Sequence, residues 1–550
     1  MITHLARAST RKVLFALLPA LAVGAVDALT APVAQQMWRG DGIGRHAIVA
    51  LVAAVLMWVL LSGADARGAV TARSERARPG ARSAAPASWR TCLLITGIAV
   101  VGWLLMWASV GPLASMNDTY SIIRNPFGAA RQHPIVYDLA VSGVVQGLRL
   151  VTGSMLPGIV LFALLQIALF TLAVAWTLRV LSRMGAPRIA LVVLAVVLGY
   201  LPITANYTFA LVKDSLFTAF AVLLVPVLLT VVRTRGRCLH ERRFLAATVL
   251  TLLGFALTRN NALVIVVLVG VLLVVLAARA RRRALVCVAA VVVVALVPQQ
   301  IVRWTAGPPK SVESLGVPLQ MVGSTLVDDP GCIPADDART FERIMPAQQW
   351  RDVFRPESVD PVKDSASFSE DELERSRGAF LGAVAGTLRA CPGPMMAGYR
   401  DQTAQLWQVD TVPVGRTSQS FFLEPISNYP ADREEIIGDL AAQGVTKQPL
   451  LGSAVGGWQE RISVAALDLT PGTGTWMWAL VLIGLAYWYR RRGEFVAIAT
   501  PALLLWGTLM AAVPTAMPFR YAAYLPWIVA IALVVLVCTR EDGGPGQSSR

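Results

Sequence analysis

The sequence predicts an all-α polytopic membrane protein, and three observations point to that fold class. Hydrophobic residues make up 55% of the 550 residues and charged residues only 15%, whereas a soluble domain carries about a quarter charged residues. The apolar residues come in blocks of roughly the 20 residues that an α-helix needs to cross a hydrocarbon core. Most basic residues lie in the short segments between these blocks, which is typical of helical membrane proteins.

We predict about twelve membrane-spanning helices from the apolar blocks. Their approximate positions are residues 12–33, 46–63, 91–111, 155–181, 186–204, 214–233, 244–258, 259–278, 284–303, 474–489, 494–513 and 520–538. The spans divide the chain into four parts. These are two N-terminal helices with a basic loop (1–90), a transmembrane module (91–303) with its first external loop at 112–154, an intervening domain (304–473), and three C-terminal helices with a tail (474–550).

The distribution of charge predicts which side of the membrane each loop faces. The loop after the second predicted span carries six arginines, and basic residues recur in alternate loops after it. Because cytoplasmic loops are enriched in Lys and Arg, we expect a plasma-membrane protein with both termini in the cytoplasm. Residues 304–473 carry 14 Lys and Arg against 23 Asp and Glu, a net charge of −9, and are expected on the extracytoplasmic side.

The overall charge of +15 raises the alternative of a nucleic-acid-binding protein. Outside residues 304–473 the net charge is +24, and it is spread over many short loops. Nucleic-acid-binding proteins instead concentrate basic residues on one folded face. The charge distribution therefore argues against nucleic acid as a partner.

The intervening domain is expected to be mostly helical. Ser369 to Glu372, with the sequence SEDE, has the pattern of a capping box at a helix start. Cys332 and Cys391 are the only two cysteines of this domain, and an oxidising compartment would favour a disulfide between them. Two unpaired thiols remain the alternative. No CxxC pair or histidine–carboxylate cluster in the sequence indicates a structural metal site.

Polar residues gather at the predicted external ends of the spans. Charged groups at membrane depth are costly, so their retention requires a physical reason. Singly, each has an ordinary explanation: a basic side chain anchors a helix end, and an acid caps one. Lys213 is one of only five lysines against 44 arginines, which favours a specific use for it. The gathered residues are Asp118, Arg124, Arg131, His133, Lys213, Asp214, Arg259, Asn260, Asn261, Arg520 and Tyr521.

Together these residues suit chemistry on an anionic, lipid-linked substrate. Arginine and lysine side chains can hold a phosphate, arginine through a bidentate fork and lysine as a point charge. An ionised carboxylate such as Asp118 can accept the proton of an attacking hydroxyl. Residues 134–150, which follow Asp118 within the first external loop, have apolar residues spaced for a helix that lies flat in the membrane interface. Such a helix would cover a cleft open to lipid.

The stretches NDTY, RNPFGAARQHPIVYD, VKDSLF, LTRNN and FRYAAYLPW resemble an uncharacterised bacterial branch of the GT-C superfamily of membrane glycosyltransferases. This superfamily includes protein O-mannosyltransferases and arabinosyltransferases, which use polyprenyl-phosphate sugars on the non-cytoplasmic side. The layout is similar too. The third to ninth predicted spans match a seven-helix module with an acid in its first external loop, and a domain follows the seventh helix.

The resemblance implies roles for the gathered residues. Asp118 would be the catalytic base, and Arg520 a ligand for the lipid phosphate. Many relatives have two acids close together in the first loop, whereas here no acid follows Asp118 until Asp138. A divalent metal therefore stays open as a cofactor. The other expected substrate-binding residues are Arg124, His133, Lys213, Asp214, Arg259, Asn260 and Tyr521.

These observations predict a glycosyltransferase that moves a sugar from a polyprenyl-phosphate donor to a hydroxyl of a glycan, lipid or protein. One alternative is a polymerase or ligase that moves whole oligosaccharides from lipid diphosphate carriers, and it would depend less on an acid in an early loop. Another is a transporter of an anionic or lipid-linked solute, a class that often has repeated halves. We find no internal repeat in this sequence. A non-catalytic envelope scaffold would leave the polar residues unexplained.

Overall fold

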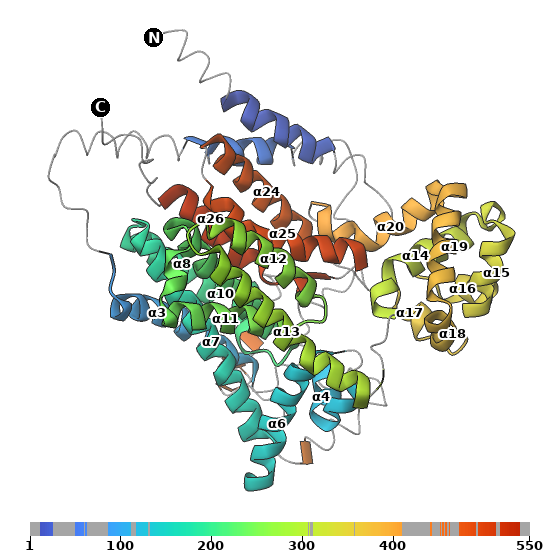
Figure 1. Cartoon of the computed structure of the whole chain (residues 1–550), viewed down its shortest axis with the longest axis horizontal. Coiled ribbons are helices and arrows are strands. Elements are labelled where there is room, and N and C mark those ends of the chain that lie inside the picture. The colour runs from blue at the N-terminus through green and yellow to red at the C-terminus, as the bar shows by residue number, and fades with distance from the viewer. Residues whose placement is uncertain are drawn as a thin grey trace.

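The computed structural model describes most of the chain, and every regular element in the described part is a helix (Figure 1). The described residues are 12–25, 50–59, 61–62, 86–111, 117–129, 133–305, 307, 312–356, 358–409, 441–442, 451–452, 454–455, 457–458, 461, 472–490, 493–512 and 518–538.

Seven of the described helices are long and apolar enough to cross a membrane. A bent pair, α8 (Arg188–Tyr200) and α9 (Pro202–Phe209), would make an eighth span. The protein is therefore an all-helical membrane protein, as the sequence predicted. The seven are α3 (Trp89–Val110), α6 (Ile135–Thr152), α7 (Leu156–Arg183), α10 (Lys213–Thr234), α13 (Arg281–Thr305), α25 (Glu494–Ala512), and the segment Arg520–Cys538, which joins η6 (Pro518–Ala522) to α26 (Leu525–Cys538).

The count of twelve spans stays a prediction. At five of the predicted positions the described helix has fewer than 18 residues, and parts of the first two predicted spans lie outside the described residues. The five helices are Lys12–Ala25, Ala50–Val59, α11 (Arg242–Leu257), α12 (Ala262–Leu276) and α24 (Thr473–Tyr489).

Helix α6 is the segment that was expected to lie flat in the membrane interface. It has 18 residues and meets the length and composition of a span, although the sequence analysis did not count it. It packs antiparallel on α7, and the two extend together beyond the rest of the bundle (Figure 1). A Cβ atom on Gly158 would lie 2.5 Å from the Cα atom of Val145, so only glycine permits this close approach. The interfacial placement of α6 stays a prediction.

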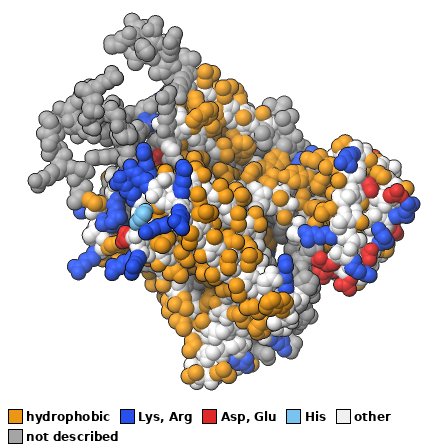
Figure 2. Space-filling view, viewed as in Figure 1, with side chains coloured by type: hydrophobic (Ala, Val, Ile, Leu, Met, Phe, Trp, Pro, Cys, Tyr) orange, Lys and Arg blue, Asp and Glu red, His pale blue; other side chains and the backbone are white. Residues whose placement is uncertain are grey.

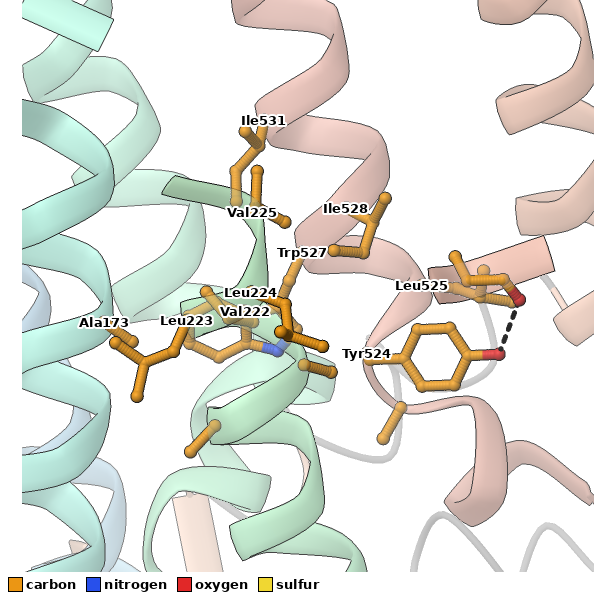
Figure 3. Packing of buried hydrophobic residues seen from close by; sticks show 14 of the residues in the cluster. Ala173, Val222, Leu223, Leu224, Val225, Tyr524, Leu525, Trp527, Ile528 and Ile531 are labelled. Atoms are coloured by element: carbon orange, nitrogen blue, oxygen red, sulfur yellow. Dashed lines mark hydrogen bonds between the residues drawn. The ribbon is translucent and has the colours of Figure 1, made fainter. Parts of the chain in front are cut away.

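Helix α10 is the centre of the bundle and is mostly buried. It packs against α7, α11, α25 and α26, and Figure 3 shows Trp527 of α26 beside Val222–Val225 of α10. The ring centroids of Trp527 and Phe170 are 5.1 Å apart. The Tyr524 hydroxyl donates a hydrogen bond of 3.3 Å to the carbonyl oxygen of Ala502. This packing fixes the N-terminus of α10 next to the start of the last span.

Residues 312–409 form a second helical unit, at the right of Figure 1. It has its own hydrophobic core, centred on Phe341, Trp350 and Phe380. The Ser369 hydroxyl accepts the amide hydrogen of Glu372 at 3.2 Å, which is the N-cap half of the predicted capping box, whereas the Ser369 N–H donates to the carbonyl oxygen of Ile344 at 2.8 Å. Its helices are α14 (Gly316–Asp328), α15 (Ala335–Ile344), α16 (Ala347–Val353), α17 (Asp360–Lys363), α18 (Glu370–Arg375), α19 (Arg377–Ala390) and α20 (Pro392–Trp407), with the 3-10 helices η3 (Val312–Leu315) and η4 (Pro330–Cys332).

This unit is joined to the bundle through the C-terminal end of α20. The indole N–H of Trp478 donates to the carbonyl oxygen of Trp407 at 2.7 Å, and that of Trp506 donates to Leu406 at 2.7 Å. Carbonyl groups at a helix C-terminus have no partner within the helix, so these indoles satisfy them. Within the unit, a disulfide joins Cys332 to Cys391, the pair suggested by the sequence.

Candidate functional site

The site is built around the N-terminus of α10. Pro202 disfavours a helical conformation at Leu201, and the backbone there is extended, so α8 and α9 meet at a bend of 68°. Helix α9 is buried along its whole length. After it, the chain runs inside the bundle and enters α10 at Lys213 and Asp214. An acid in the first turn is favourable because the N-terminus of a helix carries partial positive charge.

Two side chains from distant segments secure the non-helical stretch before α10. The Gln166 amide of α7 donates to the carbonyl oxygen of Ala210 at 2.8 Å. The Thr119 hydroxyl of α4 (Asn117–Arg124) donates to the carbonyl oxygen of Leu211. Buried carbonyl groups need such partners. The two hydrogen bonds therefore hold α4 and α7 against the entrance of α10.

Lys213 lies against His133, 80 residues earlier in the sequence. The Nζ atom of Lys213 is 2.5 Å from Nδ1 of His133, and both side chains are half-buried. A lysine ammonium has only donors, so the imidazole accepts through Nδ1 in this geometry and carries its hydrogen on Nε2. The pair connects the start of α10 to the segment that leads into α6.

Asp214 forms a buried ion pair with Arg259. The Nη1 atom of Arg259 is 2.7 Å from Oδ1 of Asp214, and the two side chains are 10% and 1% exposed. Arg259 lies in the short connection between α11 and α12, and its Nε–H donates to the Asn261 side chain at 3.3 Å. The Asn261 amide in turn donates to the Thr508 hydroxyl of α25 at 2.8 Å. Asp214 and Asn261 therefore both fix the orientation of the Arg259 guanidinium.

Tyr521, at the start of the last span, contacts two guanidinium groups. The Cζ atom of Arg259 is 4.8 Å from the ring centroid of Tyr521, and that of Arg520 is 4.6 Å from it. Arg520 also donates to the Tyr521 hydroxyl. Arg259 has a further ring contact with Phe217, at 5.2 Å. Cation–π contacts of this kind are favourable, and more so where the cation is removed from water.

A small cavity, with room for about one water molecule, lies where these segments meet. Lys213, Asp214 and Arg520 supply its charged side chains. With Arg259 beside Asp214, the described residues bring three positive charges and one carboxylate to this region. The arrangement suits an anion. The remaining lining residues are Thr119, Ile122, Tyr137 and Val212.

Six of the sequence-predicted residues come together here: His133, Lys213, Asp214, Arg259, Arg520 and Tyr521. Asp118 lies in α4 next to Thr119, and its side chain is outside the described part of the structure, as is all of Arg131. The side chains of Arg124 and Asn260 are exposed. Thr119 and Tyr137 also line the cavity but were not predicted as site residues from the sequence. Thr119 stands in the NDTY stretch, so its position beside Asp118 was the one available indication.

A metal ion was left open by the sequence. Within the described residues, no three His, Cys, Asp or Glu side chains are grouped so that they could hold one. The described lining is cationic, and its one carboxylate is already paired with an arginine. These residues do not fit a divalent cation, so we derive no step through a metal.

No curated protein and no solved structure matches the chain. Residues 120–377, less than half of the chain, match a family of unknown function, DUF6020. The matched region contains His133, Lys213, Asp214 and Arg259, whereas Arg520 lies outside it. The chain is thus similar to DUF6020 over most of the site and the first part of the helical unit.

Proposed function

We propose that the protein is a membrane glycosyltransferase that moves a sugar from a polyprenyl-phosphate donor to a hydroxyl acceptor on the extracytoplasmic side. The observation that carries this proposal is the convergence of Lys213, Arg520 and the Asp214–Arg259 pair on one cavity. These groups come from three segments that are far apart in the sequence. A set of cations around a single cavity supports a phosphate-bearing substrate.

In this proposal Lys213 and Arg520 hold the donor phosphate. Asp118 removes the proton from the acceptor hydroxyl, and the acceptor oxygen then attacks the anomeric carbon of the sugar. The bond between that carbon and the phosphate oxygen breaks, and its electron pair leaves with the lipid phosphate. The two cations stabilise the negative charge that develops on the phosphate.

Asp214 has a different role, as a positioning residue. Its carboxylate is buried and bonded to Arg259, so it is poorly placed to accept a proton from an acceptor. It holds the Arg259 guanidinium against the Tyr521 ring, and the same ring contacts Arg520. We therefore assign the role of catalytic base to Asp118. Asp214, Arg259 and Tyr521 hold Arg520 in position.

The size of the cavity limits what it can enclose. The cavity has room for about one water molecule, far less than the roughly 300–1,000 Å³ of pockets for drug-sized ligands. We therefore assign to its mouth only the donor phosphate, with the sugar ring and the polyprenyl chain outside. The many exposed apolar side chains of α6 and α7, among them Leu150 and Leu165, suit contact with such a chain.

The test is a paired assay on purified full-length protein in lipid. Wild type, Asp118→Asn, Arg520→Gln and the exposed-site control Arg389→Gln are offered a panel of polyprenyl-phosphate sugars, and donor binding and release of free lipid phosphate are both followed. We expect Asp118→Asn to bind donor but lose on the order of 10²–10⁴-fold in turnover. Arg520→Gln should weaken donor binding by about 10- to 100-fold, because a charge-assisted hydrogen bond is lost. The control should match wild type.

Two outcomes would reject the proposal. If wild type neither binds nor turns over any donor of the panel, the ligase and transporter hypotheses take its place. If Asp118→Asn is as active as wild type, the base is assigned to the wrong residue, even where donor turnover itself is observed.

A further inference from the structure

A second charged surface lies away from the cavity, where two helix turns meet. We call residues 233–243 and 277–283 the basic turns. The backbone N–H of Arg279 donates to the carbonyl oxygen of Arg235 at 2.9 Å, and the Arg283 guanidinium donates to Leu239 at 3.4 Å. Gly236 has a φ of +83°, and a Cβ atom there would lie 2.7 Å from the Cα atom of Ala277. The two turns therefore pack backbone against backbone as one surface.

The basic turns are strongly positive. Eight of their arginines are exposed, and Glu241 is their only acid. Figure 2 shows Lys and Arg side chains gathered at one end of the molecule, on the side away from the 312–409 unit. Arg235 has a φ of 50°, the only positive φ of a non-glycine residue in the described part. Arg235 ends α10 as a left-handed C-cap, a common way for a helix to end.

Exposed apolar side chains border the basic turns on the same helices. Leu285 and Val286 follow Arg281–Arg283 within about one turn of α13 and are 59% and 62% exposed. Leu250 of α11 and Val275 of α12 are 65% and 61% exposed. An apolar belt that ends in a ring of arginines matches the boundary between acyl chains and headgroups. A soluble acidic partner would account for the arginines but not for the belt.

From this arrangement we infer that the basic turns bind the phosphate headgroups of anionic phospholipids in the adjoining leaflet. Each arginine guanidinium can donate two parallel hydrogen bonds to phosphate oxygens, and the belt keeps the same lipids' acyl chains beside the helices. Each arginine near an anionic membrane surface contributes about a fivefold gain in binding. This surface is separate from the cavity, so the inference does not depend on sugar transfer.

The experiment uses full-length protein in neutral detergent and measures binding of fluorescent phosphatidylglycerol. The test variant combines Arg237→Gln, Arg281→Gln and Arg282→Gln. The matched control combines Arg343→Gln, Arg377→Gln and Arg389→Gln, which removes the same charge from exposed positions of the helical unit. Competitors are unlabelled phosphatidylglycerol, phosphatidylcholine, inorganic phosphate and polyglutamate, the last two at matched charge. Helix content by circular dichroism verifies that both variants are folded.

We expect wild type and control to bind equally, and the test variant to bind on the order of a hundredfold more weakly. Unlabelled phosphatidylglycerol should compete, whereas phosphatidylcholine and inorganic phosphate should not. Binding by the folded test variant that equals wild type would overturn the inference. So would displacement of the lipid by inorganic phosphate or by polyglutamate, because either result would assign the surface to a soluble anion or an acidic protein.

Discussion

The Asp214–Arg259 pair makes a prediction about stability that does not depend on any function. Replacing Arg259 by glutamine removes the guanidinium and leaves the Asp214 carboxylate, which is 1% exposed, without its 2.7 Å partner. Breaking a buried ion pair in this way costs roughly 3–5 kcal/mol, because the remaining charge is neither solvated nor paired. The lost contacts with the rings of Phe217 and Tyr521 add about 1–2 kcal/mol.

The free energy of unfolding can be measured on the full chain by titrating mixed micelles with a denaturing detergent. Wild type is compared with Arg259→Gln, with Asp214→Asn, with the double variant and with the exposed-site control Arg343→Gln. In the double variant no charge is left buried, so we expect it to recover at least about 2 kcal/mol relative to Arg259→Gln. The control should stay within about 0.5 kcal/mol of wild type.

The double variant is the decisive member of this set. If its loss of stability equals the sum of the losses in Arg259→Gln and Asp214→Asn, the two residues are not energetically coupled, and the support assigned to Asp214 is wrong. A cost below about 1 kcal/mol for Arg259→Gln would likewise contradict burial of the pair.

Two further predictions concern the helical unit. Cys332→Ser opens a disulfide-closed loop whose ends are 59 residues apart. It should lower the free energy of unfolding by up to about 4 kcal/mol in the chain-entropy treatment. Reduction of the disulfide in wild type should have the same effect. Burial raises the pKa of Asp401 from 3.8 to about 6, with Arg400 opposing the shift. A folded-state pKa above the unfolded value means that stability falls as pH rises from about 4 to 6. Asp401→Asn should therefore be more stable than wild type at pH 8 by roughly 1–3 kcal/mol, with the difference shrinking as the pH falls from about 6 to 4.

These two predictions have simple controls. Cys238→Ser removes a cysteine that is outside the disulfide, and it should leave the response to reductant unchanged. Equal sensitivity of Cys332→Ser and wild type to reductant would argue against the disulfide. For Asp401 the readout is the thermal midpoint as a function of pH, and a constant difference between variant and wild type from pH 5 to 8 would contradict the assigned titration.

The fold class could be predicted because its causes are local in the sequence. Apolar blocks define membrane helices, and the SEDE pattern defines the start of a helix at Ser369. Helix α6 was not counted as a span because Asp138, Gln146 and Arg149 interrupt its apolar residues. In the structure Asp138 is buried and Gln146 donates to the carbonyl oxygen of Ile123, so its polar groups serve tertiary contacts that no local pattern reveals.

The site could be predicted as a set of residue types but not as a set of pairs. The position of Lys213 and Arg520 at span ends is visible in the sequence, since charge at membrane depth is rare. That Lys213 meets His133, or that Tyr521 contacts two guanidiniums, depends on how α4, α10 and the last span pack. Such contacts depend on three-dimensional packing, and no periodic pattern in the sequence indicates them.

The position of Tyr521 also has a consequence for how the protein is made. Arg259 leaves the ribosome about 260 residues before Tyr521, an interval on the order of tens of seconds at typical rates of translation. Throughout that time the nascent chain already contains Asp214, so Arg259 can enter the bilayer as half of a neutral pair. The aromatic ring that carries both guanidiniums arrives only with the last span. The site is thus assembled at the end of synthesis, and a prematurely terminated chain would insert without it.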